Sequence, residues 1–138
     1  MDSNLRREII LDNYQNPFHK ETKDDYLKVN TNNESCIDNI DIYFSFDGDV
    51  LKDITFNGEA CAISTSATSI LLRNVIGKTR EEISNILLNY DNLINEKEYD
   101  KDLLKDLNVY DEIYLQPNRK NCALLPANAI RKALEQTK

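Results

Sequence analysis

The sequence predicts an α+β fold: a small antiparallel β-sheet with helices packed on one face. Two observations support this prediction. Two consecutive segments have apolar residues that alternate along the chain, and sequence with helical periodicity lies before and after them. The chain has 138 residues, enough for one hydrophobic core but short for two. We therefore expect a single domain over residues 1–138.

The sheet is predicted from residues 40–56. Apolar side chains alternate with polar ones over 40–46, which is typical of a strand with one buried face. Asp47-Gly48-Asp49 follows as a tight turn, because Gly48 can adopt positive φ without steric cost. The return strand is expected over 50–56, and a further short strand over 26–29. The segments 40–46 and 50–56 predict a β-hairpin with one buried face.

The helices are predicted from apolar periodicity and from their end signals. Asn16-Pro17 ends the first helix, because a residue before proline is pushed out of the helical region. Thr79 and Glu82 form a capping-box pattern that opens another helix. Pro126 is placed in the first turn of the last helix, where its missing N–H costs nothing. The expected helices cover residues 5–16, 62–76, about 79–90, 95–107 and the segment from Pro126 to about Glu135.

Charge and hydropathy narrow the classes of function. The chain carries 24 acidic and 17 basic residues, a net charge of −7, which disfavours a phosphate backbone as partner. No apolar run approaches the roughly 18 residues that a membrane helix needs. The first residues lack the pattern of a signal peptide. We expect a cytoplasmic protein that binds neither nucleic acid nor membrane.

The three cysteines are the chemically informative residues. Cys36, Cys61 and Cys122 cannot all pair within one chain, and disulfides are rare in the cytoplasm. One interpretation is three unrelated buried cysteines. The other is a shared metal site, because each cysteine lies where a predicted element begins or ends. Cys36 is followed two residues later by Asp38, and side chains two apart in extended chain point the same way.

Zinc binds four ligands in a tetrahedron, and thiolates and carboxylates both serve. Cys36, Asp38, Cys61 and Cys122 would complete such a site, with a formal charge of −2. Arg119 could offset that charge, although a solvated surface arginine is an equally good interpretation. His19, the single histidine, is better explained as a solvated loop residue than as a ligand or base.

Several motifs resemble the IscU/NifU-type family of iron–sulfur cluster assembly proteins, in particular its SufU branch. The segment 10–17, ending in Tyr14-Gln15-Asn16-Pro17, is similar to the end of the family's first helix. Cys36-Ile37-Asp38 resembles its Cys-Gly-Asp motif, 58–64 its Gly-x-Gly-Cys-x-Ile-Ser motif, and 119–123 its Arg-x-Lys-Cys-Ala motif. From residue 61 to residue 122 the interval is 61 residues, and Asn121 stands where scaffold-type members have histidine. The length of this interval and the absence of that histidine both resemble the SufU branch. The resemblance therefore implies one SufU/IscU-like domain over residues 1–138.

The resemblance implies a zinc-dependent sulfur carrier of the sulfurtransferase type. It implies that Cys36, Asp38, Cys61 and Cys122 hold zinc, and that a SufS-type cysteine desulfurase delivers persulfide sulfur. It further implies that a histidine of the desulfurase replaces one cysteine on the zinc. The freed thiolate, here expected to be Cys36, then accepts the sulfur, and Arg119 helps docking or steadies the anionic sulfur. Downstream cluster-assembly proteins are further implied partners.

Three departures from the family pattern concern the site. Ile37 replaces a glycine between two expected ligands, so positive φ is disfavoured there. Ala60 replaces a glycine beside Cys61, and Asn121 replaces a lysine, which removes a positive charge. Phe18 and His19 also replace the usual Arg-Asn after the proline.

Two other functions compete with the sulfur carrier. The same four ligands could form a scaffold on which a [2Fe–2S] cluster is assembled. Alternatively, zinc could be purely structural in a domain that only binds partners.

Overall fold

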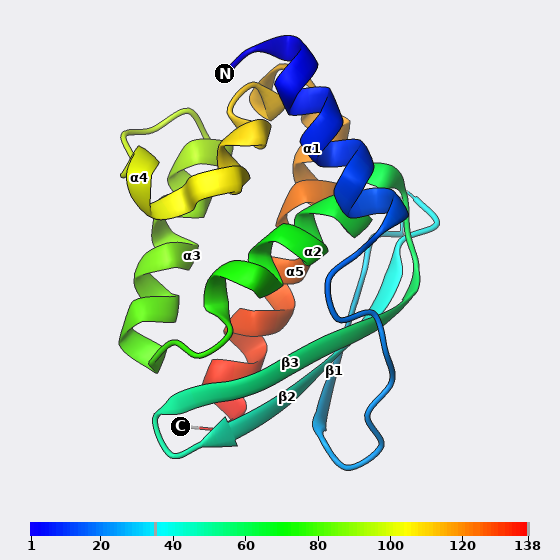
Figure 1. Ribbon diagram of the computed structural model, residues 1–138, viewed down its shortest axis with the longest axis vertical. Coiled ribbons are helices and arrows are strands. Elements are labelled where there is room, and N and C mark those ends of the chain that lie inside the picture. Colours follow the sequence, from blue (N-terminus) through cyan, green and yellow to red (C-terminus); the bar gives the residue numbers. More distant parts are fainter. Residues whose placement is uncertain (35, 138) are drawn as a thin grey trace.

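The computed structural model describes residues 1–34 and 36–137. A three-stranded antiparallel sheet has the order β1-β2-β3, and the helices gather on one side of it (Figure 1). The strands are β1 (Leu27–Asn32), β2 (Asn39–Asp47) and β3 (Val50–Glu59). The helices are α1 (Ser3–Gln15), α2 (Ala62–Val75), α3 (Arg80–Ile94), α4 (Lys101–Leu104) and α5 (Pro117–Gln136), with 3-10 turns η1 (Lys105–Tyr110) and η2 (Ile113–Leu115). The predicted fold class is confirmed.

The predicted hairpin forms as β2 and β3. Asp47 pairs with Val50 across the turn, and Gly48 has φ of 59°. Ile40, Ile42 and Phe44 of β2 are buried and belong to the hydrophobic core. The sheet therefore presents one apolar face to the helices, as the alternating pattern indicates.

Helix α2 lies at the centre of the helical layer and contacts α1, α5 and β3. Its buried face is rich in small side chains, which allow close approach of neighbouring elements. Polar members of that face bind their neighbours: Ser69 Oγ donates to Asn13 Oδ1 of α1 at 2.7 Å and accepts the Phe18 N–H at 2.8 Å. This packing holds the middle of α2, and the candidate site lies at the first turn of the same helix.

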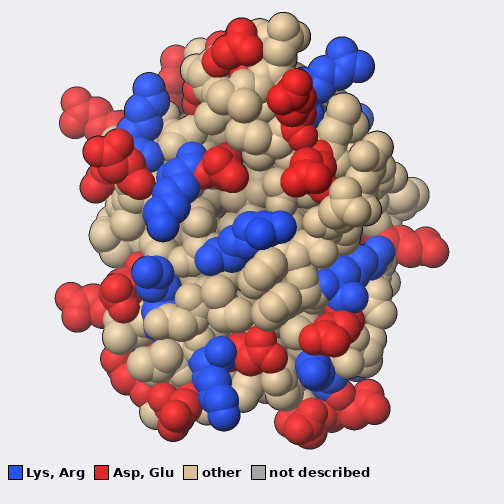
Figure 2. Space-filling view, viewed as in Figure 1, with Lys and Arg blue, Asp and Glu red and all other residues tan. Residues whose placement is uncertain are grey.

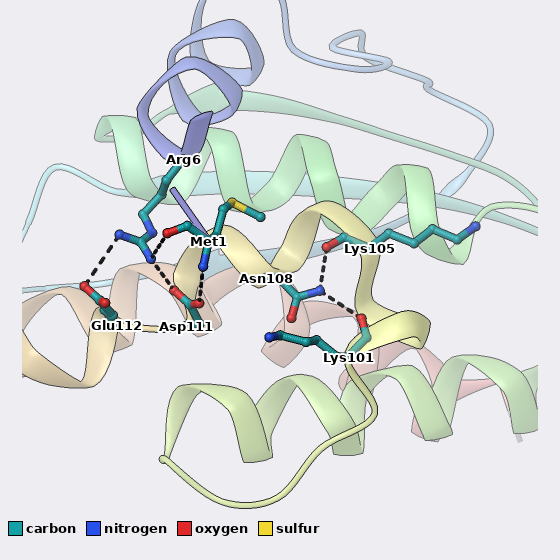
Figure 3. Close-up of polar contacts among 7 residues, drawn as sticks. All are labelled: Met1, Arg6, Lys101, Lys105, Asn108, Asp111 and Glu112. Atoms are coloured by element: carbon teal, nitrogen blue, oxygen red, sulfur yellow. Dashed lines mark hydrogen bonds and ion pairs between the residues drawn. The ribbon is translucent and has the colours of Figure 1, made fainter. Parts of the chain in front are cut away.

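An ionic cluster attaches α1 to the segment after η1 (Figure 3). The Arg6 guanidinium lies 2.8 Å from the Asp111 carboxylate and 3.5 Å from that of Glu112. The amino terminus of Met1 lies 3.7 Å from Asp111. These ion pairs join the beginning of the chain to a segment that is more than a hundred residues away in sequence.

The turn from α4 into η1 is held by one side chain. The Asn108 amide donates to the carbonyls of Lys101, at 2.9 Å, and Lys105, at 2.7 Å (Figure 3). Lys105 has φ of 49°, which interrupts regular helix at this point. The predicted helical region 95–107 is therefore wrong in its form: it begins only at Lys101 and continues as a 3-10 turn to Tyr110.

The start of the last helix also differs from the prediction. Helix α5 begins at Pro117, and Pro126 lies in its interior. Pro117 occupies the first helical position, where a missing N–H is harmless. At Pro126 the missing N–H would leave the Cys122 carbonyl unpaired, but the Ser64 hydroxyl lies 3.2 Å from it. The tertiary structure thus supplies a partner that the helix itself lacks.

Acidic and basic side chains are interspersed on the face drawn in Figure 2, with no continuous basic surface among the residues described there. Within residues 1–34 and 36–137, no helix is long and apolar enough to cross a membrane.

Candidate metal centre

Four side chains that could bind a metal ion converge at one end of the sheet. Cys36 and Asp38 come from the loop between β1 and β2, Cys61 from the junction of β3 and α2, and Cys122 from α5. One ligand atom from each lies within 4.8 Å of all the others. The structure therefore brings together the four residues that the sequence singled out.

The loop that carries Cys36 and Asp38 is closed by backbone hydrogen bonds. The Asn33 N–H donates to the Asp38 carbonyl at 3.1 Å, and the Cys36 N–H donates to the Asn33 carbonyl at 3.0 Å. The Asn33 amide also lies 3.6 Å from the Cys122 sulfur. Ile37, in the same loop, is 70% exposed. Its φ is not positive, so its backbone conformation does not require glycine. Isoleucine in place of glycine is thus compatible with this loop.

Asp38 is held by hydrogen bonds on both carboxylate oxygens. Its Oδ1 accepts the Cys61 N–H at 2.7 Å, and its Oδ2 accepts the Ser64 hydroxyl at 2.6 Å. Burial raises the pKa of Asp38, but the hydrogen bonds from Ser64 and Cys61 outweigh it, so the pKa lies below its ordinary value. The carboxylate is therefore ionised at neutral pH, as a metal ligand must be.

Cys61 is the N-cap residue of α2. Its sulfur accepts the Ser64 N–H at 3.4 Å and lies 3.8 Å from Asp38 Oδ2. The predicted position of Cys61 between strand and helix is confirmed.

Cys122 lies in the second turn of α5, deeper in the helix than the sequence indicated, because the helix starts at Pro117. Burial, with the neighbouring Asp38 carboxylate and Cys61, raises the pKa of the Cys122 thiol to about 12. The protein environment alone thus favours a neutral thiol here. A bound dication would act in the opposite direction and favour the thiolate.

A pocket of about 470 Å³ opens onto the centre. Cys36, Cys122 and Arg119 are among the residues that line it. The pKa of Arg119 is raised, first by a hydrogen bond to the Cys122 side chain and then by the charge of Cys61. Arg119 is exposed and lines the same pocket as Cys36 and Cys122, so its positive charge lies beside the thiols.

The donor set fits zinc. Zinc–sulfur bonds of about 2.3 Å in a tetrahedron place ligand atoms roughly 3.8 Å apart. The widest separation here, 4.8 Å, needs only a small contraction of the four side chains. Three cysteines and a carboxylate are ligand types that zinc accepts, and all four positions can be filled by this chain.

His19 does not belong to this group. Its Nδ1 lies 3.1 Å from the Ile54 carbonyl and 3.5 Å from the Asp53 carboxylate, on the middle of β3. Two residues that the sequence analysis did not single out do contact the centre, namely Ser64 and Asn33. Ser64 stands three residues after Cys61, and this spacing places it in the first turn of the helix that Cys61 caps. The spacing is the sequence feature from which a contact between Ser64 and the centre could have been predicted.

The fold and the site together define a class: a single α+β unit with a three-cysteine, one-aspartate candidate metal centre at the end of its sheet. Residues 5–138 match the model of the NifU-like N-terminal domain family. The chain belongs to this family.

Two curated relatives illustrate the range of the family. The zinc-dependent sulfurtransferase SufU of Bacillus subtilis is 32% identical over 131 residues, which cover 94% of this chain and 89% of the relative. The iron–sulfur cluster assembly scaffold protein IscU of Streptococcus pyogenes is 28% identical over 136 residues, which cover 98% of this chain and 86% of the relative.

A solved structure agrees over nearly the whole fold. The crystal structure of an iron–sulfur cluster assembly scaffold protein for the SUF system from Fervidobacterium islandicum has 32% sequence identity. It superposes with a TM-score of 0.88 and covers 96% of this chain and 99% of its own. The resemblance to the SufU and IscU proteins that the motifs indicated is confirmed.

Proposed function

We propose that this protein is a zinc-dependent sulfur carrier, which accepts persulfide sulfur from a cysteine desulfurase for iron–sulfur cluster assembly. The observation that carries the proposal is the convergence of Cys36, Asp38, Cys61 and Cys122 within 4.8 Å. The similarity to a relative named as a zinc-dependent sulfurtransferase supports it. Zinc bound by these four residues would hold their thiols as thiolates at neutral pH.

Cys36 is the proposed sulfur acceptor. Asp38, Cys61 and Cys122 are tied to each other or to Ser64 by hydrogen bonds. No hydrogen bond to the Cys36 sulfur is found within the described residues, and Cys36 lines the pocket. A partner can therefore reach Cys36 with less rearrangement than the other cysteines.

The proposed transfer is a thiol exchange without net oxidation. The Cys36 thiolate attacks the outer sulfur of the persulfide on the desulfurase cysteine. The sulfur–sulfur bond of that persulfide breaks, the desulfurase cysteine leaves as a thiolate, and a new sulfur–sulfur bond forms at Cys36. Arg119, whose guanidinium faces the thiols, would stabilise the negative charge that moves with the sulfur.

The first experiment is elemental analysis of the purified chain for zinc, iron and acid-labile sulfide. We expect about one zinc per chain and a marked loss of zinc in Asp38→Ala. Asp41→Ala is the matched control, because Asp41 lies on β2 and bonds Asn30 outside the centre. Equal zinc content in both variants would contradict the assignment of Asp38.

The second experiment tests the acceptor. The chain is incubated with a SufS-type desulfurase and free cysteine, and the mass of the Cys36 peptide is measured. We expect one added sulfur atom on Cys36 and stimulated desulfurase turnover, both lost in Cys36→Ala. Undiminished stimulation by Cys36→Ala would contradict the role of Cys36.

A scaffold for a [2Fe–2S] cluster is the second candidate function, because relatives named as IscU scaffolds also match the chain. Copurified iron and sulfide with visible absorbance would favour it. Asn121 in place of the scaffold-type histidine supports the sulfur carrier instead.

A further inference from the structure

The Ser64 side chain contacts several residues of the candidate centre. It is fully buried in the first turn of α2. Its Oγ lies 2.6 Å from Asp38 Oδ2, 3.2 Å from the Cys122 carbonyl and 3.6 Å from the Cys61 sulfur. One hydroxyl thus touches three of the four residues that would hold the metal.

The chemistry of a hydroxyl decides how these contacts are used. A hydroxyl has one proton to donate and two lone pairs that accept. The bond to Asp38 is the shorter one and is assisted by the carboxylate charge, so the proton is directed mainly to Asp38. Together with the Cys61 N–H on Oδ1, this bond fixes the rotation of the Asp38 carboxylate.

Pro126 links Ser64 to Cys122. Proline has no N–H, so the carbonyl of Cys122, four residues earlier, lacks its helical donor. Ser64 Oγ is the polar group that approaches this carbonyl. The position of the Cys122 backbone is therefore coupled to the same hydroxyl that orients Asp38.

We propose that Ser64 is a positioning residue of the metal centre, one that orients the Asp38 carboxylate and couples it to Cys122. This inference rests on the proposed zinc binding. Groups that hydrogen-bond a metal ligand fix its orientation, and their loss typically weakens metal affinity. Ser64 itself donates no electron pair to the metal in this proposal.

A purely structural role makes a different prediction, and Ser66 provides the control. Ser66 is also fully buried on α2, and its hydroxyl forms a hydrogen bond with the Tyr110 hydroxyl. Ser66→Ala therefore also removes a buried hydrogen bond. Ser66 does not contact the four candidate ligands in the described structure. Ser66→Ala therefore reports the general cost of removing a buried hydroxyl from this helix.

The test compares native chain, Ser64→Ala, Ser66→Ala and Ser64→Thr, which keeps the hydroxyl. Zinc affinity is measured by competition with a chromophoric chelator, and the ligand geometry by the absorption of bound cobalt(II). Removal of Ser64 is expected to weaken zinc binding by about 10- to 100-fold and to shift the cobalt bands. Ser66→Ala and Ser64→Thr are expected to keep the native affinity and spectrum.

Equal effects of Ser64→Ala and Ser66→Ala, or native zinc affinity and cobalt spectrum in Ser64→Ala, would overturn the inference while leaving the proposed function intact. A native chain that binds no zinc would instead overturn the proposed function. Circular dichroism checks folding. If Ser64→Ala does not fold, Ser64→Thr decides: native affinity and spectrum support the role of the hydroxyl, and their loss overturns it.

Discussion

At the scale of single residues, Gly58 is the position that the backbone constrains most strongly near the centre. Its φ is +136°, a conformation that other residues rarely adopt. A Cβ at this position would lie 2.2 Å from the Asn39 carbonyl oxygen, on the neighbouring strand. Gly58 stands three residues before Cys61, so any displacement here moves a candidate ligand.

Replacement of Gly58 by alanine is expected to lower the free energy of unfolding by about 3 kcal/mol and to weaken zinc binding. Gly48→Ala is the control, because Gly48 also has positive φ but nothing lies within 4 Å of its added Cβ. Its cost is expected to be about 1 kcal/mol, without loss of zinc. Denaturant unfolding and zinc titration check both values, and equal costs would contradict the steric explanation.

At the scale of elements, the interior proline of α5 shows how neighbours replace a missing helical bond. Near Pro126, two carbonyls accept hydrogen bonds from side chains of other elements, and a third is approached by the Ser64 hydroxyl. Ser64 lies against the Cys122 carbonyl, Tyr90 donates to that of Ala123 at 2.6 Å, and Thr31 donates to that of Leu125 at 3.0 Å. Helix α5 is thereby bound to α2, α3 and β1 beside the candidate centre.

Helix α3 provides a prediction of pH dependence. The capping box is present as the sequence predicts, with Glu82 accepting the Thr79 N–H at 3.0 Å. Hydrogen bonds from Thr79, first from its backbone and then from its side chain, lower the pKa of Glu82. A lowered pKa in the folded state means that ionised Glu82 contributes stability above its unfolded pKa. That contribution is lost as pH falls through the folded value.

The native chain is therefore expected to be more stable than Glu82→Gln at pH 7. The difference should shrink as the pH falls from about 5 towards 3, where Glu82 becomes protonated. Glu81→Gln, one residue away in the same first turn, is the control for loss of charge alone. Unfolding by guanidinium chloride across this pH range measures the difference, and a constant difference would contradict the capping explanation.

At the scale of the whole molecule, the hydrophobic core and the candidate centre are separate. The core is formed by buried apolar side chains of the sheet, α2, α3, α5 and the 3-10 turns. The candidate ligands lie at the end of the sheet and are not part of that cluster. We therefore expect the core to bury its apolar surface without a metal ion.

Removal of zinc by a chelator is accordingly expected to lower the melting temperature but to leave the chain folded. Zinc at a thousandfold excess over its dissociation constant stabilises the native state by about 4 kcal/mol. Circular dichroism of the chelated chain should keep its helical signal and a cooperative melt. Complete unfolding on chelation would instead favour zinc as a purely structural ion.

The predicted sheet, the capping box and the helices over 5–16 and 62–76 agree closely with the structure, because each rests on local periodicity and end signals. The error at the last helix has a different origin. Pro126 is unfavourable in a helix taken alone, and the polar group beside the carbonyl that it leaves without a donor is Ser64, a residue 62 positions earlier in the sequence. Sequence near Pro126 contains no sign of that partner.

The fold class, the hairpin and the four candidate ligands could be predicted from the sequence, since periodicity and residue chemistry are local properties. The packing of the whole chain established that these ligands converge within 4.8 Å and that Ser64 and Asn33 contact them. It also decided that Cys36 and Cys122 line the same pocket, Cys36 half-buried and Cys122 buried. The physical reason is that convergence and burial depend on how distant segments pack, and no local pattern specifies that packing.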